Sequence, residues 1–135
     1  MSFLELSENS KVHVQEIDSQ HEKLTGLLNQ LHDAMAQRQE KAALDLLVSE
    51  LCEFTREHFA YEESLMSEYE YPDYPKHKEE HTKLLKHIVD LENQYRGGDL
   101  LLSFGIIIDL KGWAMIHIEK SDKTLGTFLN SKNVF

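Results

Sequence analysis

The sequence predicts an all-α protein: an antiparallel up-down four-helix bundle with an irregular N-terminal arm, formed by residues 1–135 as one domain. Apolar residues recur at alternating spacings of three and four through four segments, which is the pattern of helices that bury one face. The connections between these segments are short, and short connections join antiparallel neighbours in bundles. The chain has only two prolines and six glycines and lacks the regularly spaced turns of an all-β protein.

The first predicted helix begins near Asp18 or Ser19, because Ser19-Gln20-His21-Glu22 matches a capping box. Residues 1 to about 17 form the arm before it. Their weakly alternating apolar side chains predict that the arm packs across the bundle ends. The inward stripe of the first helix consists of His21, Leu24, Leu28, Leu31 and Met35.

The second predicted helix runs from about Lys41 to about Tyr69, and the proline-containing segment 71–75 ends it. Pro75 suits the first turn of the third helix, which Gly97-Gly98 ends, and the fourth helix begins near Leu100. The inward stripes of these three helices are, in chain order, Leu44, Leu47, Leu51, Phe54, His58, Glu62 and Leu65; then His77, His81, Leu84, Ile88, Leu91 and Tyr95; then Ile106, Leu110, Trp113 and His117.

The composition excludes several classes of partner. The net charge is -10 at pH 7 and the pI is about 5.2, so the chain repels the phosphates of nucleic acids and of anionic membrane surfaces. The single cysteine, Cys52, allows neither an intramolecular disulfide nor a cysteine-cluster zinc site, and it fits a reducing compartment. The N-terminal residues lack the features of a signal peptide, and the apolar stretch 100–108 is too short to span a bilayer. We therefore expect a cytoplasmic location and no direct membrane insertion.

The unusual feature of the sequence is its eight histidines, because each of the four apolar stripes contains at least one. His58 and Glu62 are four residues apart, as are His77 and His81, so each pair shares a helix face. A single buried histidine is usually a hydrogen-bonded core residue. Several imidazoles and acids buried together without partners would destabilise the fold strongly. A metal ion removes that cost by coordinating them.

The number of candidate ligands predicts two metal ions. Seven ligands are too many for one tetrahedral zinc, and a mixture of histidines and carboxylates suits iron better than calcium or magnesium. If both carboxylates and one oxide or hydroxide bridge two irons, three histidines make one iron six-coordinate. Two histidines then leave the other iron five-coordinate, with one open position. Neutral imidazoles leave the diferrous centre less electron-rich than four carboxylates would, which favours reversible binding of O2 over its cleavage. The candidate ligands are His21, His58, Glu62, His77, His81, His117 and Asp122.

Four motifs resemble those of hemerythrins, and of bacterial hemerythrins in particular, over essentially the whole chain. They are Val14-x-x-Ile17-Asp18-x-Gln20-His21, His58-Phe59-x-x-Glu62-Glu63-x-x-Met66, Tyr71-Pro72-x-Tyr74-x-x-His77-x-x-x-His81, and His117-Ile118-x-x-x-Asp122-Lys123. The combination is specific, whereas a single His-x-x-x-His is weak. The resemblance implies the following roles: His77, His81 and His117 hold the six-coordinate iron, His21 and His58 hold the iron that binds O2, and Glu62 and Asp122 bridge the two.

Within this family, the sequence looks closest to the domain at the C-terminal end of a chemotaxis receptor from a sulfate-reducing bacterium. That likeness implies sensing of O2 or of redox state, with the signalling domains of a parent receptor as partners. Other functions stay open: a di-iron enzyme of the peroxidase or oxidase type, a stand-alone carrier or store of O2, and an iron store or nitric oxide responder.

Two details of the fourth helix give separate predictions. His117 and Asp122 are five residues apart, about 140° on an ideal α-helix, so both face the site only if a π-type bulge lies between them. Glu119 stands where hemerythrins usually carry an aliphatic residue over the O2 pocket. On an ideal helix Glu119 points to water, but with this distortion we expect it near or on the open iron, as an acid or base for peroxide chemistry. An engineered substitution would explain such an acid. The remaining histidines, expected outside the site, are His13, His32 and His87.

Overall fold

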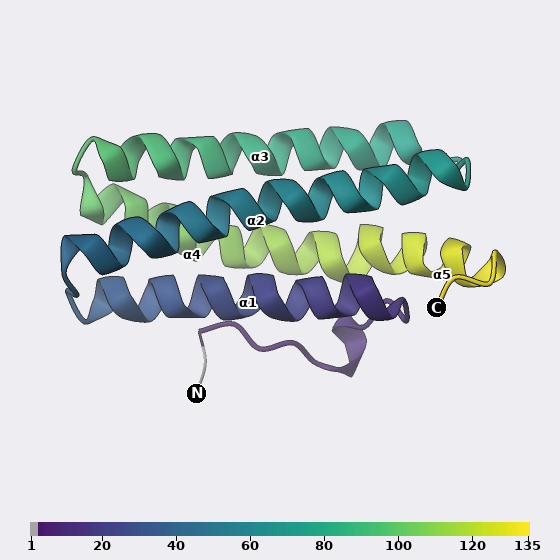
Figure 1. Ribbon diagram of the computed structural model, residues 1–135, viewed down its shortest axis with the longest axis horizontal. Helices are drawn as coiled ribbons and strands as arrows, with labels where there is room; N and C mark the ends of the chain where they lie inside the picture. The colour runs from purple at the N-terminus through teal and green to yellow at the C-terminus, as the bar shows by residue number, and fades with distance from the viewer. Residues whose placement is uncertain (1–2) are drawn as a thin grey trace.

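The structure, a computed structural model, describes residues 3–135 and shows long antiparallel helices packed side by side (Figure 1). Contacts of α1 with α2, α2 with α3, α3 with α4, and α4 with α1 close the bundle. The predicted all-α four-helix bundle is therefore confirmed. The elements are η1 (Glu8–Ser10), α1 (Gln15–Ala36), α2 (Lys41–Glu68), α3 (Tyr74–Arg96), α4 (Leu100–Ile116), the π-helical turn η2 (His117–Asp122) and α5 (Lys123–Ser131).

Proline and glycine set the ends of α3 as predicted, and an aspartate that the sequence analysis did not single out caps α4. Pro75 lies in the first turn of α3 and Gly97 is its C-cap. Gly98 follows with a φ of 82°, in the left-handed region that favours glycine. The side chain of Asp99 then accepts a hydrogen bond of 2.9 Å from the backbone N–H of Leu102 and so caps α4.

The predicted start of the first helix is wrong, because α1 begins at Gln15. The Asp18 carboxylate accepts hydrogen bonds from the backbone N–H groups of Val12 (2.9 Å) and His13 (3.1 Å). Asp18 therefore holds the end of the arm instead of capping the helix. Ser19, the first residue of the predicted capping box, is exposed in the second turn of α1.

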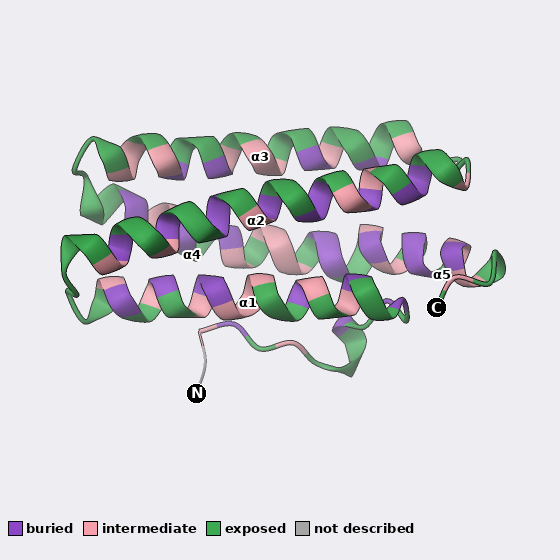
Figure 2. Ribbon diagram, viewed as in Figure 1, coloured by how far each residue is buried: buried purple, intermediate pink, exposed green. Residues whose placement is uncertain are grey.

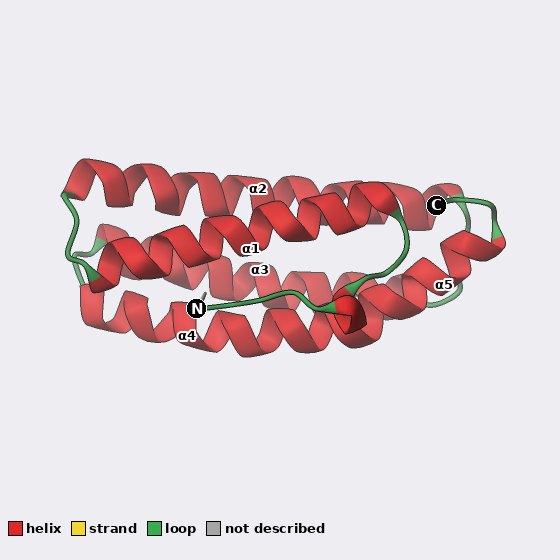
Figure 3. Cartoon of the chain, turned by 90° about the horizontal axis from the view of Figure 1, so that it is seen from below, coloured by secondary structure: helices red, strands yellow, loops and turns green. Residues whose placement is uncertain are grey.

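The N-terminal arm runs along the side of the bundle, past α1 and α4, and not across its ends as predicted (Figures 1 and 3). Asn29 in the middle of α1 holds the backbone of Leu4 at both its N–H and its carbonyl, at 2.8 and 2.9 Å. Farther along, Val12 packs directly on Gly126 of α5, where any Cβ would overlap the Val12 carbonyl oxygen. Residues 1 and 2 of the predicted arm lie outside the described residues.

The core consists of two apolar clusters, one toward each end of the bundle, and Figure 2 shows the buried positions along the inner faces of the helices. The first cluster includes Leu27, Leu31, Leu44, Leu51, Leu91 and Ile107. The second includes Val12, Ile17, Met66, Leu125 and Leu129. On each helix the predicted metal ligands come directly beside or between residues of these clusters, so well-packed side chains hold them from both ends.

The continuous helical run Leu100–Ser131 is long and apolar enough, by length and composition alone, to cross a membrane. This run is longer than the apolar stretch 100–108 on which the sequence-based expectation rested. A single helix of this kind is weak support for a membrane span, because a core helix passes the same test. Here its inner face contacts α1 and α3.

Candidate metal centre

The seven predicted ligands meet inside the bundle, between the two apolar clusters. None of these seven residues is more than 5% exposed. Polar groups buried this deeply need partners, so their mutual arrangement decides what the site can hold. The contributors are His21 from α1, His58 and Glu62 from α2, His77 and His81 from α3, and His117 and Asp122 from η2.

The carboxylate of Glu62 divides its two oxygens between two sets of histidines. Its Oε1 atom lies 3.1 Å from Nε2 of His81 and 3.3 Å from Nε2 of His77. Its Oε2 atom lies 3.0 Å from Nε2 of His58 and 3.6 Å from Nε2 of His21. One oxygen therefore faces α3, and the other faces α1 and the preceding turn of α2.

The carboxylate of Asp122 makes the same division. Its Oδ1 atom lies 3.0 Å from Nε2 of His77 and 3.0 Å from Nε2 of His117. Its Oδ2 atom lies 3.0 Å from Nε2 of His21. Both carboxylates thus join a three-histidine group (His77, His81 and His117) to a two-histidine group (His21 and His58).

These atoms converge without satisfying one another as hydrogen-bond partners. Nε2 of His21 and of His117, Oε2 of Glu62 and both oxygens of Asp122 are buried and lack a hydrogen bond of acceptable geometry. Two ligands about 2.1 Å from one metal ion, at right angles to each other, lie about 3.0 Å apart. The spacing and the unmet polar atoms therefore fit two metal ions, each beside one histidine group, with both carboxylates shared.

The charges of the site act strongly on one another. Burial alone would lower the pKa of His21 and of His77, but the carboxylates of Asp122 and Glu62 outweigh burial and raise each pKa to about 10. Burial would likewise raise the pKa of Glu62 and of Asp122, yet the neighbouring histidines hold both pKa values well below the usual range. Both acids are therefore ionised at neutral pH and offer negative charge to cations.

The π-helical turn η2 brings His117 and Asp122 to the same side of the fourth helix. The predicted distortion is confirmed, since η2 spans His117–Asp122. Hydrogen bonds between residues five apart widen this turn, so five residues rotate by about 400°, slightly more than one revolution, instead of about 500° as on an α-helix. Both side chains consequently face the centre, and such turns occur frequently at functional sites.

A protein-family model described as the hemerythrin HHE cation binding domain matches residues 12–129, which include all seven predicted ligands. This chain belongs to the hemerythrin family. The predicted resemblance to bacterial hemerythrins is confirmed, and hemerythrins are oxygen-binding proteins rather than enzymes.

Known bacterial hemerythrins cover most of this chain. A bacteriohemerythrin of Stenotrophomonas maltophilia (strain R551-3) is 30% identical over 123 residues, which are 91% of this chain and 79% of the relative. One of Methylococcus capsulatus is 29% identical over 114 residues, 84% of this chain and 86% of the relative. A solved structure of a hemerythrin mutant has a TM-score of 0.84 at 27% identity and covers 94% of this chain and 97% of that chain.

Glu119 does not face the metal centre of this hemerythrin, so the prediction that placed it near or on iron is wrong. The side chain is exposed, whereas its neighbour Ile118 is buried at 6% exposure. In a π turn each residue rotates by roughly 80°, so the turn that returns Asp122 to the side of His117 leaves Glu119 on the opposite side. An exposed glutamate needs no engineered substitution to explain it.

An apolar cavity of about 80 Å³ borders the two-histidine group of this hemerythrin. Both members of that group, His21 and His58, line it with Ile118, whereas of the three-histidine group only His117 does, beside the shared Asp122. A water molecule needs about 10–15 Å³ of cavity volume measured in this way, so the cavity has room for a diatomic gas, and its apolar wall disfavours water. Its remaining lining is mostly apolar and includes Leu4, Leu24, Leu28, Phe59, Ile88 and Leu110.

Three polar side chains beside this centre were missed as functional residues in the sequence analysis. Nδ1 of His58 lies 2.6 Å from Oε1 of Gln20. Nδ1 of His81 lies 2.9 Å from Oε2 of Glu63. Each partner directly precedes or follows a predicted ligand in the sequence, and that adjacency was the available signal.

The third of these side chains is Glu80, whose Oε1 atom lies 3.1 Å from Nδ1 of His117. The same oxygen accepts a hydrogen bond of 2.5 Å from the hydroxyl of Ser121. Burial would raise the pKa of Glu80, but the bonds from Ser121 and His117 outweigh it and lower the pKa. Glu80 is therefore an anion held against a predicted ligand.

The three histidines expected outside the site lie away from the two ligand groups. His13 is exposed. His32 is half-buried and stacks on Phe3, with ring centroids 4.0 Å apart, and His87 stacks on Trp113 at 3.7 Å. Both rings therefore take part in aromatic packing.

Proposed function

We propose that this hemerythrin domain holds two iron ions, bridged by one oxide or hydroxide, and binds dioxygen reversibly at one of them. The observation that carries the proposal is the division of both shared carboxylates between a group of three histidines and a group of two. In this assignment His77, His81 and His117 would hold one iron, His21 and His58 would hold the iron with an open position, and Glu62 and Asp122 would bridge them.

The side chains around this centre would control access to it. The cavity beside His21 and His58 offers a small apolar molecule a place next to the open position, and the bulk of Ile118 and Phe59 excludes water. Iron, when bound, supplies the electrons that hold dioxygen reversibly. The protein supplies the fixed positions of the donors and the apolar surroundings.

We further propose a role in sensing O2 or redox state for chemotaxis, in the cytoplasm, with signalling domains of a parent receptor as partners. This finer proposal rests on the sequence resemblance to a receptor domain. The peroxidase-like or oxidase-like alternative depended on an acid at the open iron, and the exposed position of Glu119 removes that reason.

Iron content and optical spectra test the proposal. Purified chain reconstituted with ferrous iron should hold two irons, stay colourless without oxygen, gain a visible absorption band with O2, and lose it under vacuum. Fewer than two irons per chain would overturn the proposal. Immediate oxidation followed by peroxide-dependent turnover of a phenol would favour an enzyme instead.

A pair of histidine variants makes this test specific. His58→Ala should abolish the oxygen-dependent band, because it removes a donor of the two-histidine group. His13→Asn is the matched control: His13 is exposed and has a φ of 65°, a conformation that asparagine tolerates. Equal loss of the band in both variants would contradict the assignment.

A further inference from the structure

The two histidine groups differ in the charge of the side chains behind them. In the three-histidine group, His81 meets the carboxylate of Glu63 and His117 meets the carboxylate of Glu80. In the two-histidine group, His58 meets the neutral amide of Gln20. Nδ1 of His21 is buried and has no hydrogen-bond partner among residues 3–135.

The direction of these hydrogen bonds is fixed by the surroundings. Because Nε2 of each histidine faces the centre, Nδ1 carries the proton and donates it to the partner. The amide of Gln20 is oriented by a second bond, in which its Nε2 donates to Oε1 of Glu16 at 3.0 Å. The oxygen of Gln20, and not its NH2 group, therefore faces His58.

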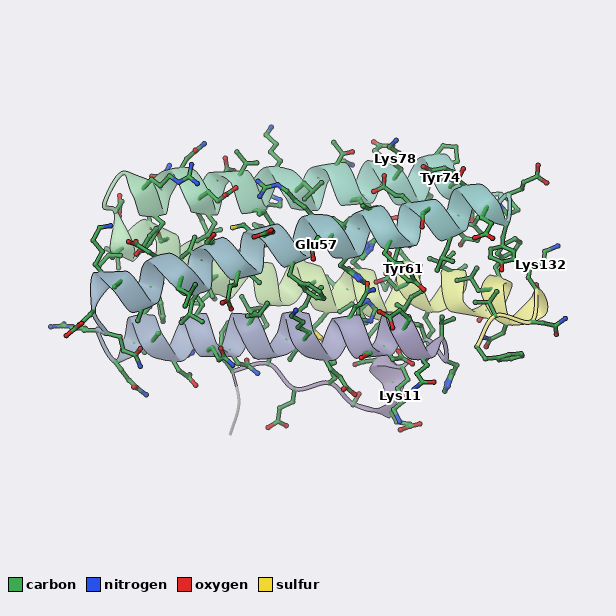
Figure 4. All side chains as sticks on the ribbon, viewed as in Figure 1. Lys11, Glu57, Tyr61, Tyr74, Lys78 and Lys132 are labelled. Atoms are coloured by element: carbon green, nitrogen blue, oxygen red, sulfur yellow. The ribbon has the colours of Figure 1, made fainter. Side chains whose placement is uncertain are left out.

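A carboxylate behind a metal-bound histidine makes the imidazole a stronger electron donor than a neutral amide does. Stronger donation stabilises the more oxidised state of the metal. Glu80 is the clearest case, because Ser121 and His117 hold its Oε1 atom in place and, among residues 3–135, neither a lysine nor an arginine forms a salt bridge with it. Glu63 has a weaker version of the same role, because Lys78, labelled on α3 in Figure 4, lies 3.9 Å from its Oε1 atom and offsets part of its charge.

We infer that Gln20, Glu63 and Glu80 are positioning residues that set the two irons at different reduction potentials. The iron of the three-histidine group gives up the first electron, and the iron at the cavity stays ferrous longer. This inference rests on the proposed function. With ferricyanide as oxidant, the first equivalent takes one electron from the diferrous centre and becomes ferrocyanide, leaving one ferric ion beside His81 and His117. The second equivalent oxidises the iron beside His58.

Redox titration of the iron-loaded chain tests this inference, after iron content has been measured. Glu80→Gln keeps an oxygen for His117 and Ser121 but removes the charge. It should raise the first midpoint potential by at least about 59 mV, a tenfold change in a one-electron equilibrium, and leave the second unchanged. Glu63→Gln should move the same midpoint in the same direction by a smaller amount. Gln20→Glu should lower the second midpoint and leave the first unchanged.

Glu79→Gln is the matched control for charge. Glu79 is next to Glu80, is exposed, and pairs with Lys83 at 3.6 Å on its own helix. Its substitution changes the net charge equally but should not shift either midpoint comparably. A control shift equal to that of Glu80→Gln, or joint movement of both midpoints, overturns the inference.

The design separates this inference from the proposed function. Fewer than two irons in the unmodified chain overturns both. Two irons with midpoints that do not respond to Glu80→Gln or Glu63→Gln overturns the inference alone. The two glutamate variants act on different helices, so loss of folding in one leaves the other as the test.

Discussion

Ile118 and Glu119 are neighbours on η2 with opposite surroundings, so alanine substitutions at these positions test how the π turn orients its side chains. Ile118 is 6% exposed and lines the cavity, whereas Glu119 is exposed. Ile118→Ala removes buried carbon atoms beside an existing cavity and enlarges it. Such substitutions cost about 2–4 kcal/mol in the free energy of unfolding. Glu119→Ala removes no buried contact and should change it by no more than about 0.5 kcal/mol.

These energies translate into distinct melting temperatures. For a domain of 135 residues, the entropy of unfolding is about 0.28 kcal/mol per kelvin. Ile118→Ala should therefore lower Tm by about 7–14 °C, and Glu119→Ala should change it by about 2 °C or less. Far-ultraviolet circular dichroism during heating measures both, with all proteins at the same metal content.

The opposite ranking would refute the orientation of η2. If Glu119→Ala lowered Tm as much as Ile118→Ala is expected to, the acid would face the interior and the isoleucine would face water. If Ile118→Ala changed Tm by no more than the glutamate variant, the cavity would not be bounded by this side chain. The same two outcomes would restore the hypothesis of an acid near the open iron.

Three further predictions concern the metal-free centre, the arm and the buried thiol. The pKa values of His21 and His77 rise from 6.5 to about 10 on folding, so the stability they add to the metal-free chain is complete below about pH 6.5 and lost as pH rises through about 10. Urea unfolding at several pH values should show this decline, and His21→Asn should make it shallower. Gly126→Ala should destabilise the fold by about 1–3 kcal/mol because its Cβ overlaps Val12, whereas Gly26→Ala, with nothing within 4 Å, should stabilise α1 by up to about 1 kcal/mol. Burial raises the pKa of the Cys52 thiol to about 12, so a thiol reagent at pH 8 should react only when urea unfolds the chain. If the native chain reacted as fast as the unfolded chain, that result would contradict the packing of α2.

Local spacing predicted the helices and the inner residues of the site. His58 and Glu62 had to share a face of α2, as did His77 and His81 on α3, because four residues span slightly more than one turn. The residues His117 and Asp122 do not have this spacing. The conflict between their five-residue separation and a shared role predicted the π-helical turn η2 from the sequence alone. A spacing that departs from the helical repeat was therefore as informative about this site as spacings that match it.

The errors came from contacts that only the folded chain creates. Asp18 looked like a helix cap, but its carboxylate binds the arm at Val12 and His13, and packing of the arm on α5 holds them there. Glu119 was misplaced because the direction of each residue inside a π turn depends on where the extra residue enters. Spacing alone established that η2 exists but did not give the direction of Glu119.

The same geometry also explains the outer partners. A residue next to a ligand is rotated by about 100° on an α-helix, so it points toward a neighbouring helix. Gln20 precedes its ligand on α1, Glu63 follows its ligand on α2, and Glu80 precedes its ligand on α3. Partners that precede a ligand alternate with partners that follow one, because successive helices run in opposite directions. Each partner consequently reaches a histidine on the next helix.

If the same alternation holds on the fourth helix, the residue that follows His117 should point toward α1. That residue is Ile118, which cannot accept a hydrogen bond and lines the cavity together with His21. The series of polar side chains that accept hydrogen bonds from the ligand histidines therefore does not include a partner for His21. Its Nδ1 atom is without a hydrogen-bond partner among the described residues. Polar neighbours on three helices support His58, His81 and His117. One apolar neighbour on the fourth helix leaves the apolar space beside His21. The asymmetry of the centre and its access for a small gas thus follow from the same position on each helix.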